Sequence, residues 1–156
     1  MKAATLSEIK KELKSQEAEE VLQLCLRLGR FKKDNKVLLT YLLFEAQDEE
    51  GFIVSIKNEV DDLMEELNVS TLYFAKKGLR KILRNLNKNI RYSGNKQTEV
   101  ELLLHFCQAL KKSSIDLGRS VQLTNLYDRQ LQKIKKAMTG LHEDLQADYQ
   151  YELEKL

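Results

Sequence analysis

Apolar side chains recur every three or four residues along most of the chain. This spacing matches the 3.6-residue period of an α-helix with one face turned toward a core. The pattern therefore predicts an all-α protein of six or seven helices joined as antiparallel hairpins. The expected helices are a short one capped by Thr5, and then residues 15–29, 36–47, 48–67, 70–92, 98–111 and 121–156.

Two of these helices, residues 36–47 and 98–111, have apolar side chains on nearly all sides. A helix without a polar face is usually buried, because no side of it is suited to water. We therefore predict that these two helices lie at the centre of the fold. Cys25 and Cys107 lie within apolar helical patterns and are expected to be buried free thiols.

An amphipathic helix, a polar turn and a nearly all-apolar helix occur twice in the sequence. The two copies end in LLTYLLFEA and VELLLHFCQAL. This order resembles the helical hairpins of HEAT and armadillo repeat proteins over about residues 20–112. The resemblance implies a short α-solenoid that serves as a binding scaffold, whereas a compact helical bundle is the alternative. In either case we expect one domain over residues 1–156, with the helix at 121–156 packed on it or projecting from it.

The composition supports an all-helical fold, and the charged residues are distributed unevenly along the chain. The chain has no proline and only 6 glycines, so it has few residues suited to turns between strands. The net charge is +2, yet residues 69–98 contain 8 basic and no acidic side chains. Six of these cations follow one side of helix 70–92 and are called here the basic stripe: Lys77, Arg80, Lys81, Arg84, Lys88 and Arg91.

The basic stripe has two interpretations. In the first, it pairs with the acidic face of the neighbouring helix 48–67, where exposed ion pairs contribute only about 0.2–1 kcal/mol each. In the second, it binds an anionic partner such as nucleic acid. Both interpretations are open at the level of sequence.

Residues suited to catalysis or metal binding are few. Glu101 and His105 share a helical face but have no second pair of ligands, and neither cysteine has a base at a suitable spacing. No glycine-rich phosphate loop occurs. We therefore predict no catalytic, cofactor or metal site. An enzyme or metal-binding bundle is the least favoured of the alternatives.

The start of the chain has charges every few residues, and no apolar run is long enough to span a bilayer. These features predict a cytoplasmic protein. Apolar residues form a heptad seam in helix 121–156. They predict either that this helix closes the domain's own core or that it forms a homodimer. The seam consists of Tyr127, Leu131, Ile134, Met138, Leu141 and Leu145.

Together these patterns predict a non-enzymatic intracellular scaffold or adaptor. A protein is the first expected partner, and nucleic acid bound by the basic stripe is the second.

Overall fold

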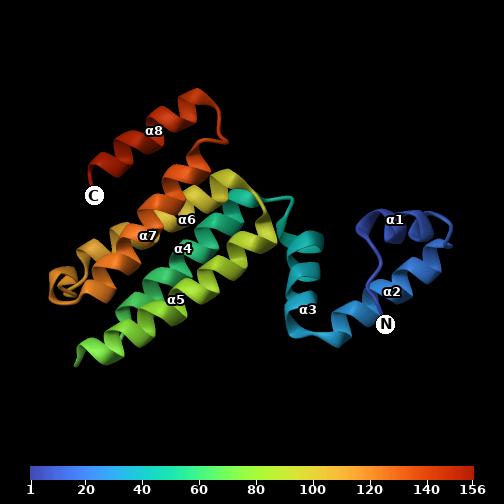
Figure 1. The fold of residues 1–156 in the computed structure, drawn as a ribbon, viewed down its shortest axis with the longest axis horizontal. Coiled ribbons are helices and arrows are strands. Elements are labelled where there is room, and N and C mark those ends of the chain that lie inside the picture. Colours follow the sequence, from blue (N-terminus) through green and yellow to red (C-terminus); the bar gives the residue numbers. More distant parts are fainter. The chain divides into compact units, whose positions relative to one another are not determined.

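A computed structural model describes all 156 residues, and every regular element in it is helical. The predicted all-α class is confirmed, with one helix more than the larger expected number. None of the helices combines the length and apolar content needed to cross a membrane. The helices are α1 (Leu6–Lys14), α2 (Ala18–Phe31), α3 (Lys33–Thr40), α4 (Glu49–Glu65), α5 (Leu72–Ser93), α6 (Lys96–Lys112), α7 (Val121–Met138) and α8 (Glu143–Glu154), with a π-helical turn at Tyr41–Glu45 and a 3-10 turn at Leu117–Arg119 (Figure 1).

The chain forms two compact units, Met1–Phe44 and Glu45–Leu156. In the second unit α6 is the central helix, because α4, α5 and α7 all pack against it (Figure 1). Leu103, Phe106 and Leu110 of α6 have no exposed surface. The prediction of a buried helix at 98–111 is therefore confirmed, and this unit is a helical bundle.

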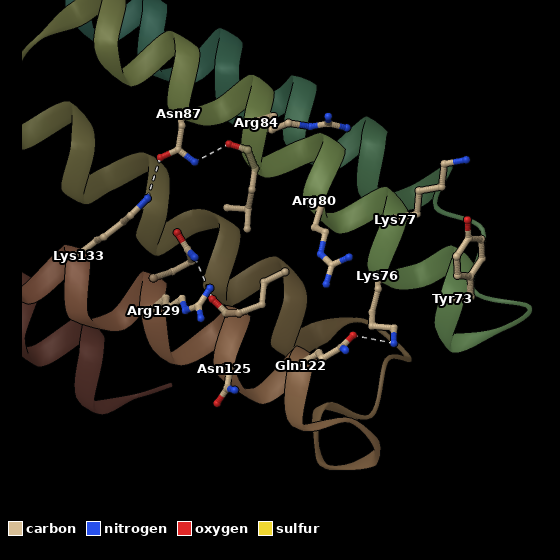
Figure 2. A pocket seen from close by; sticks show the side chains of 13 residues that line it. Tyr73, Lys76, Lys77, Arg80, Arg84, Asn87, Gln122, Asn125, Arg129 and Lys133 are labelled. Atoms are coloured by element: carbon tan, nitrogen blue, oxygen red, sulfur yellow. Dashed lines mark hydrogen bonds between the residues drawn. The ribbon is translucent and has the colours of Figure 1, made fainter.

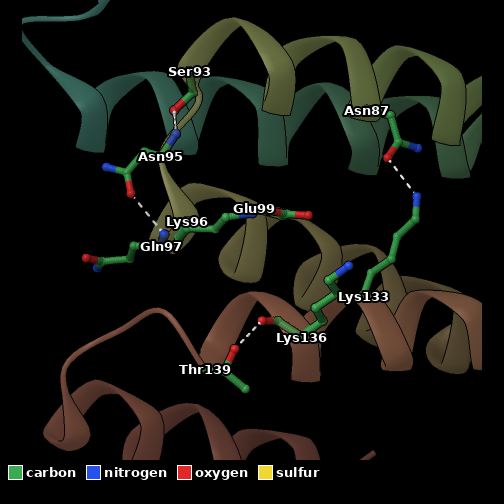
Figure 3. Close-up of polar contacts among 9 residues, drawn as sticks. All are labelled: Asn87, Ser93, Asn95, Lys96, Gln97, Glu99, Lys133, Lys136 and Thr139. Carbon is green, nitrogen blue, oxygen red and sulfur yellow. Dashed lines mark hydrogen bonds and ion pairs between the residues drawn. The ribbon is translucent and has the colours of Figure 1, made fainter.

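A short turn reverses the chain between α5 and α6. Gly94 ends α5 with a left-handed conformation (φ 67°) that suits glycine because it lacks a Cβ. The Asn95 side chain then caps α6 by accepting a hydrogen bond from the Gln97 amide at 2.9 Å (Figure 3). The Thr71 side chain caps the start of α5 by accepting a hydrogen bond from the Phe74 amide at 3.2 Å. These ends fix the position of α5 along α6.

The prediction of a single helix over residues 121–156 is wrong. The helix ends at Met138, and a new helix begins at Glu143 after His142 accepts a hydrogen bond from the Asp144 amide. Gly140 lies in the break, where its cost of about 1 kcal/mol in a helix is avoided. The heptad seam is therefore discontinuous. Its members Tyr127, Ile134 and Met138 are buried in the bundle that contains them.

The prediction of a buried helix at 36–47 is also wrong. Only Tyr41 is buried in this segment, whereas Leu42, Leu43 and Phe44 are 53, 62 and 73% exposed. The physical reason is the small number of neighbours, because α3 packs mainly against α2 in the unit Met1–Phe44. Cys25 of this unit is only half-buried, whereas Cys107 in α6 has no exposed surface.

Candidate functional site

An open groove with a volume of about 1110 Å³ runs between α5 and α7 in the second unit. Six of the thirteen side chains that line it are basic, four are amides and none is acidic. A groove with one sign of charge on its walls concentrates the electrostatic field and favours an anionic ligand. The lining residues are Tyr73, Lys76, Lys77, Arg80, Leu83, Arg84, Asn87, Gln122, Asn125, Leu126, Arg129, Gln130 and Lys133 (Figure 2).

Two hydrogen bonds cross the groove and set the register of its walls. Lys76 Nζ donates to Gln122 Oε1 at 2.9 Å, and Lys133 Nζ donates to Asn87 Oδ1 at 3.1 Å (Figure 2). Both bonds join residues that are 46 apart in sequence, so α5 and α7 run in the same direction. With a rise of 1.5 Å per residue, the two bonds lie about 16 Å apart along the groove.

Three arginines lie between these bonds. Arg80 and Arg84 come from α5, and Arg129 comes from α7. All three are exposed, and none forms an ion pair with an acidic side chain. Figure 2 shows Arg80 and Arg129 extending into the space between the two helices. Their guanidinium groups are free to form paired hydrogen bonds with phosphate or carboxylate oxygens.

The floor of the groove is less exposed and contains one unsatisfied acceptor. Leu83 is 8% exposed and Gln130 is 5% exposed. The Gln130 Nε2 donates to the Leu126 carbonyl at 2.9 Å, but its Oε1 is buried without a hydrogen-bond partner. Such buried acceptors are rare in folded proteins and cost free energy until a donor reaches them.

The groove contains half of the predicted basic stripe. Lys77, Arg80 and Arg84 line it, whereas Lys81, Lys88 and Arg91 do not. Arg129 and Lys133, the cations that α7 contributes to the groove, were not predicted as part of a site. They lie four residues apart on one side of α7. This four-residue spacing is the sequence pattern that could have identified them as part of a site.

The acidic helix α4 does not neutralise the groove. Two side-chain hydrogen bonds join α4 and α5: Asn85 Nδ2 donates to Glu59 Oε1 at 2.6 Å, and the Ser93 hydroxyl donates to Glu49 Oε1. No ion pair connects α4 with Lys77, Arg80 or Arg84. The same is true of Lys81 and Arg91 outside the groove. The acidic side chains of α4 therefore do not compensate the cations that line the groove.

The candidate metal pair, Glu101 and His105, is engaged elsewhere. Glu101 accepts hydrogen bonds from Lys57 Nζ at 2.8 Å and from Tyr149 Oη at 3.0 Å, and it lines a smaller hollow of about 410 Å³. His105 Nε2 lies 2.8 Å from Asp61 Oδ1. No group of three or more His, Cys, Asp or Glu side chains is suited to hold a metal ion. Through these hydrogen bonds Glu101 connects α6 with α4 and α8.

Protonation of Glu101 is linked to stability. Burial acts to raise the pKa of this carboxyl, but hydrogen bonds from Lys57 and Tyr149 and the Lys57 charge together lower it. Burial and the bond to Glu101 raise the pKa of Tyr149 to about 12. A carboxyl with a lowered folded-state pKa stabilises the fold above its unfolded value, and this contribution is lost as pH falls through the folded-state pKa.

Glu101→Gln is accordingly expected to lower the free energy of unfolding by about 1 kcal/mol at pH 7 and by much less at pH 3. Urea unfolding of both proteins at the two pH values measures this difference. Glu65→Gln, at the exposed end of α4, removes the same charge as a control. An effect of Glu101→Gln that is equal at both pH values would contradict the role given to its ionised form.

Comparison with known proteins gives no match to a family model, to a curated protein or to a solved structure. The HEAT-like and armadillo-like resemblance and the single-domain interpretation stay predictions. The functional argument therefore depends on the groove itself.

Proposed function

We propose that this protein is a non-enzymatic, cytoplasmic helical adaptor whose groove between α5 and α7 binds the phosphate backbone of nucleic acid. The observation that carries this proposal is the set of six basic side chains, without an acidic one, on the walls of one groove. Because of this arrangement, we now expect nucleic acid, rather than a protein, as the first partner.

The shape of the groove favours a linear polyanion. Its walls are parallel, and cations recur along both over about 16 Å, so successive phosphates can be contacted from two sides. The amide side chains of Gln122 and Asn125 are exposed and can bond to sugars and base edges, and exposed Tyr73 at one end offers a ring for base stacking. An acidic protein segment, the alternative ligand, would use the cations but would leave these groups without a function.

The lining of the groove favours binding over catalysis. It contains no Asp, Glu, His, Cys or Ser side chain, which are the residues that most often act as nucleophile or general base. The buried thiol of Cys107 lies elsewhere, and burial raises its pKa to about 12. A thiol in this state is a poor nucleophile.

The test is fluorescence anisotropy with labelled single-stranded RNA, single-stranded DNA and duplex DNA over a range of salt concentrations. We expect binding whose log Kd rises linearly with log salt, with a slope of about 2 to 5 for three to six phosphate contacts. Absence of binding to all three probes at low salt would overturn the proposal. Binding of a polyglutamate peptide as tight as that of the oligonucleotides would instead identify an acidic protein as the ligand.

A further inference from the structure

Tyr73 is an exposed aromatic residue at one end of the groove between α5 and α7. It is 64% exposed, and it is the only aromatic residue among the thirteen that line the groove. Figure 2 shows its ring beyond the hydrogen bond between Lys76 and Gln122, at the end of the groove where α5 begins. An exposed ring next to a row of cations is the combination with which proteins bind unpaired bases and their phosphates.

The first turn of α5 holds the Tyr73 ring in place. Thr71 caps this turn through the Phe74 amide, and the Phe74 ring meets the Tyr73 ring edge to face, with centroids 5.4 Å apart and an interplanar angle of 73°. This contact restricts the ring, so less conformational freedom is lost when a base stacks on it. Because Tyr73 is still largely exposed, ring surface is left open to a ligand.

The ring is in register with the cations of the same wall. Tyr73 is followed by Lys77, Arg80 and Arg84 at spacings of four, three and four residues, which keep all four on one side of α5. From Tyr73 to Asn87 this wall is about 21 Å long, at a rise of 1.5 Å per residue. A stacked strand advances about 3.4 Å per nucleotide, so the wall matches about six nucleotides.

We propose that Tyr73 stacks on an unpaired base, and that the groove therefore takes a single strand of nucleic acid rather than a duplex. This inference rests on the proposed function of the groove. In a duplex the faces of the bases are covered by their neighbours in the stack, so Tyr73 would contact no base face and only phosphates would be bound. In a single strand, a base turns its face to the ring while the following phosphates lie along Lys77, Arg80 and Arg84.

The test measures binding of the full chain by fluorescence anisotropy to labelled probes of about twelve nucleotides, twice the length that the wall matches. The probes are oligothymidylate, oligouridylate, an abasic strand with the same phosphates but no bases, and a duplex of the same length. We expect the tighter of the two base-containing strands to bind about tenfold more tightly than the abasic strand, because only the stacking is lost. It should also bind more tightly than the duplex, and its sugar identifies the ligand as DNA or RNA.

Variants of Tyr73 assign this difference to the ring. Tyr73→Ala should bind the base-containing strand about tenfold more weakly, while its binding of the abasic strand and its salt dependence stay unchanged, because no charge is lost. Tyr73→Phe keeps the ring and should bind as the wild type does. Tyr151→Ala is the matched control, because Tyr151 is 62% exposed on α8 and does not line the groove.

The outcomes separate this inference from the proposed function. The inference is overturned if the wild type binds base-containing and abasic strands equally, if Tyr73→Ala binds the base-containing strand as the wild type does, or if the duplex binds most tightly. In each of these cases the binding of phosphates in the groove still stands. Absence of binding to all four probes at low salt overturns the proposed function and this inference together.

Discussion

Replacing Phe106 with alanine is expected to lower the free energy of unfolding by about 3–5 kcal/mol. Phe106 has no exposed surface and lies in α6, against which three other helices pack. Truncation removes the ring from this core and leaves a cavity that the surrounding helices cannot fully close. A small domain has a total stability of about 5–15 kcal/mol, so the loss is a large fraction of it.

Urea unfolding followed by circular dichroism measures this loss. The matched control is Phe74→Ala, because Phe74 lies in the first turn of α5 and is 44% exposed. We expect the control to cost about 1 kcal/mol or less. Equal effects of the two substitutions would contradict the central place of α6.

The contrast between α6 and α3 shows what an apolar pattern can predict. Both segments have apolar side chains on nearly all sides, and the sequence interpretation gave both the same buried position. The pattern identifies residues that favour removal from water, but it does not say how many neighbours are available to cover them. Three helices cover α6, whereas α3 has mainly α2.

The break between α7 and α8 was missed for a different reason. The apolar positions on both sides of it continue a helical spacing, while a single glycine costs a helix only about 1 kcal/mol. Tertiary contacts easily exceed that amount. In the structure Thr139 Oγ1 also bonds back to the Lys136 carbonyl at 2.8 Å at the end of α7 (Figure 3). Such local bonds compete with helix continuation but have no distinctive sequence pattern.

The groove was only half predictable. Helical spacing on α5 is a local property, so it placed Lys77, Arg80 and Arg84 on one side of that helix. The opposite wall depends on the offset of 46 residues between α5 and α7, which both helices acquire by packing on α6. Arg129 and Lys133 come to face α5 only through that packing. A charge pattern along one helix does not contain this information.

Reversing the three arginines of the groove is expected to weaken nucleic-acid binding at least about 100-fold at low salt. The variant Arg80→Glu, Arg84→Glu and Arg129→Glu removes three charge-assisted contacts to phosphate, each contributing about 1 kcal/mol or more, and adds three repulsive charges. Because these side chains are exposed and form no ion pairs, helicity and the unfolding midpoint should change little.

A second triple variant separates the groove from the overall charge. Lys81→Glu, Arg91→Glu and Lys135→Glu change two cations of α5 and one of α7, as in the groove variant, but at exposed positions outside the groove. Both variants change the net charge from +2 to −4. We expect this control to weaken binding only a few-fold, through the long-range field.

The salt dependence completes the comparison. Neutral replacements by glutamine at Arg80, Arg84 and Arg129 should reduce the slope of log Kd against log salt by about 2, because three fewer counterions are released from a single strand. The same replacements at Lys81, Arg91 and Lys135 should leave the slope unchanged. If both sets reduce the affinity and the slope equally, the ligand responds to the charge of the whole bundle, and the groove between α5 and α7 is not its binding site.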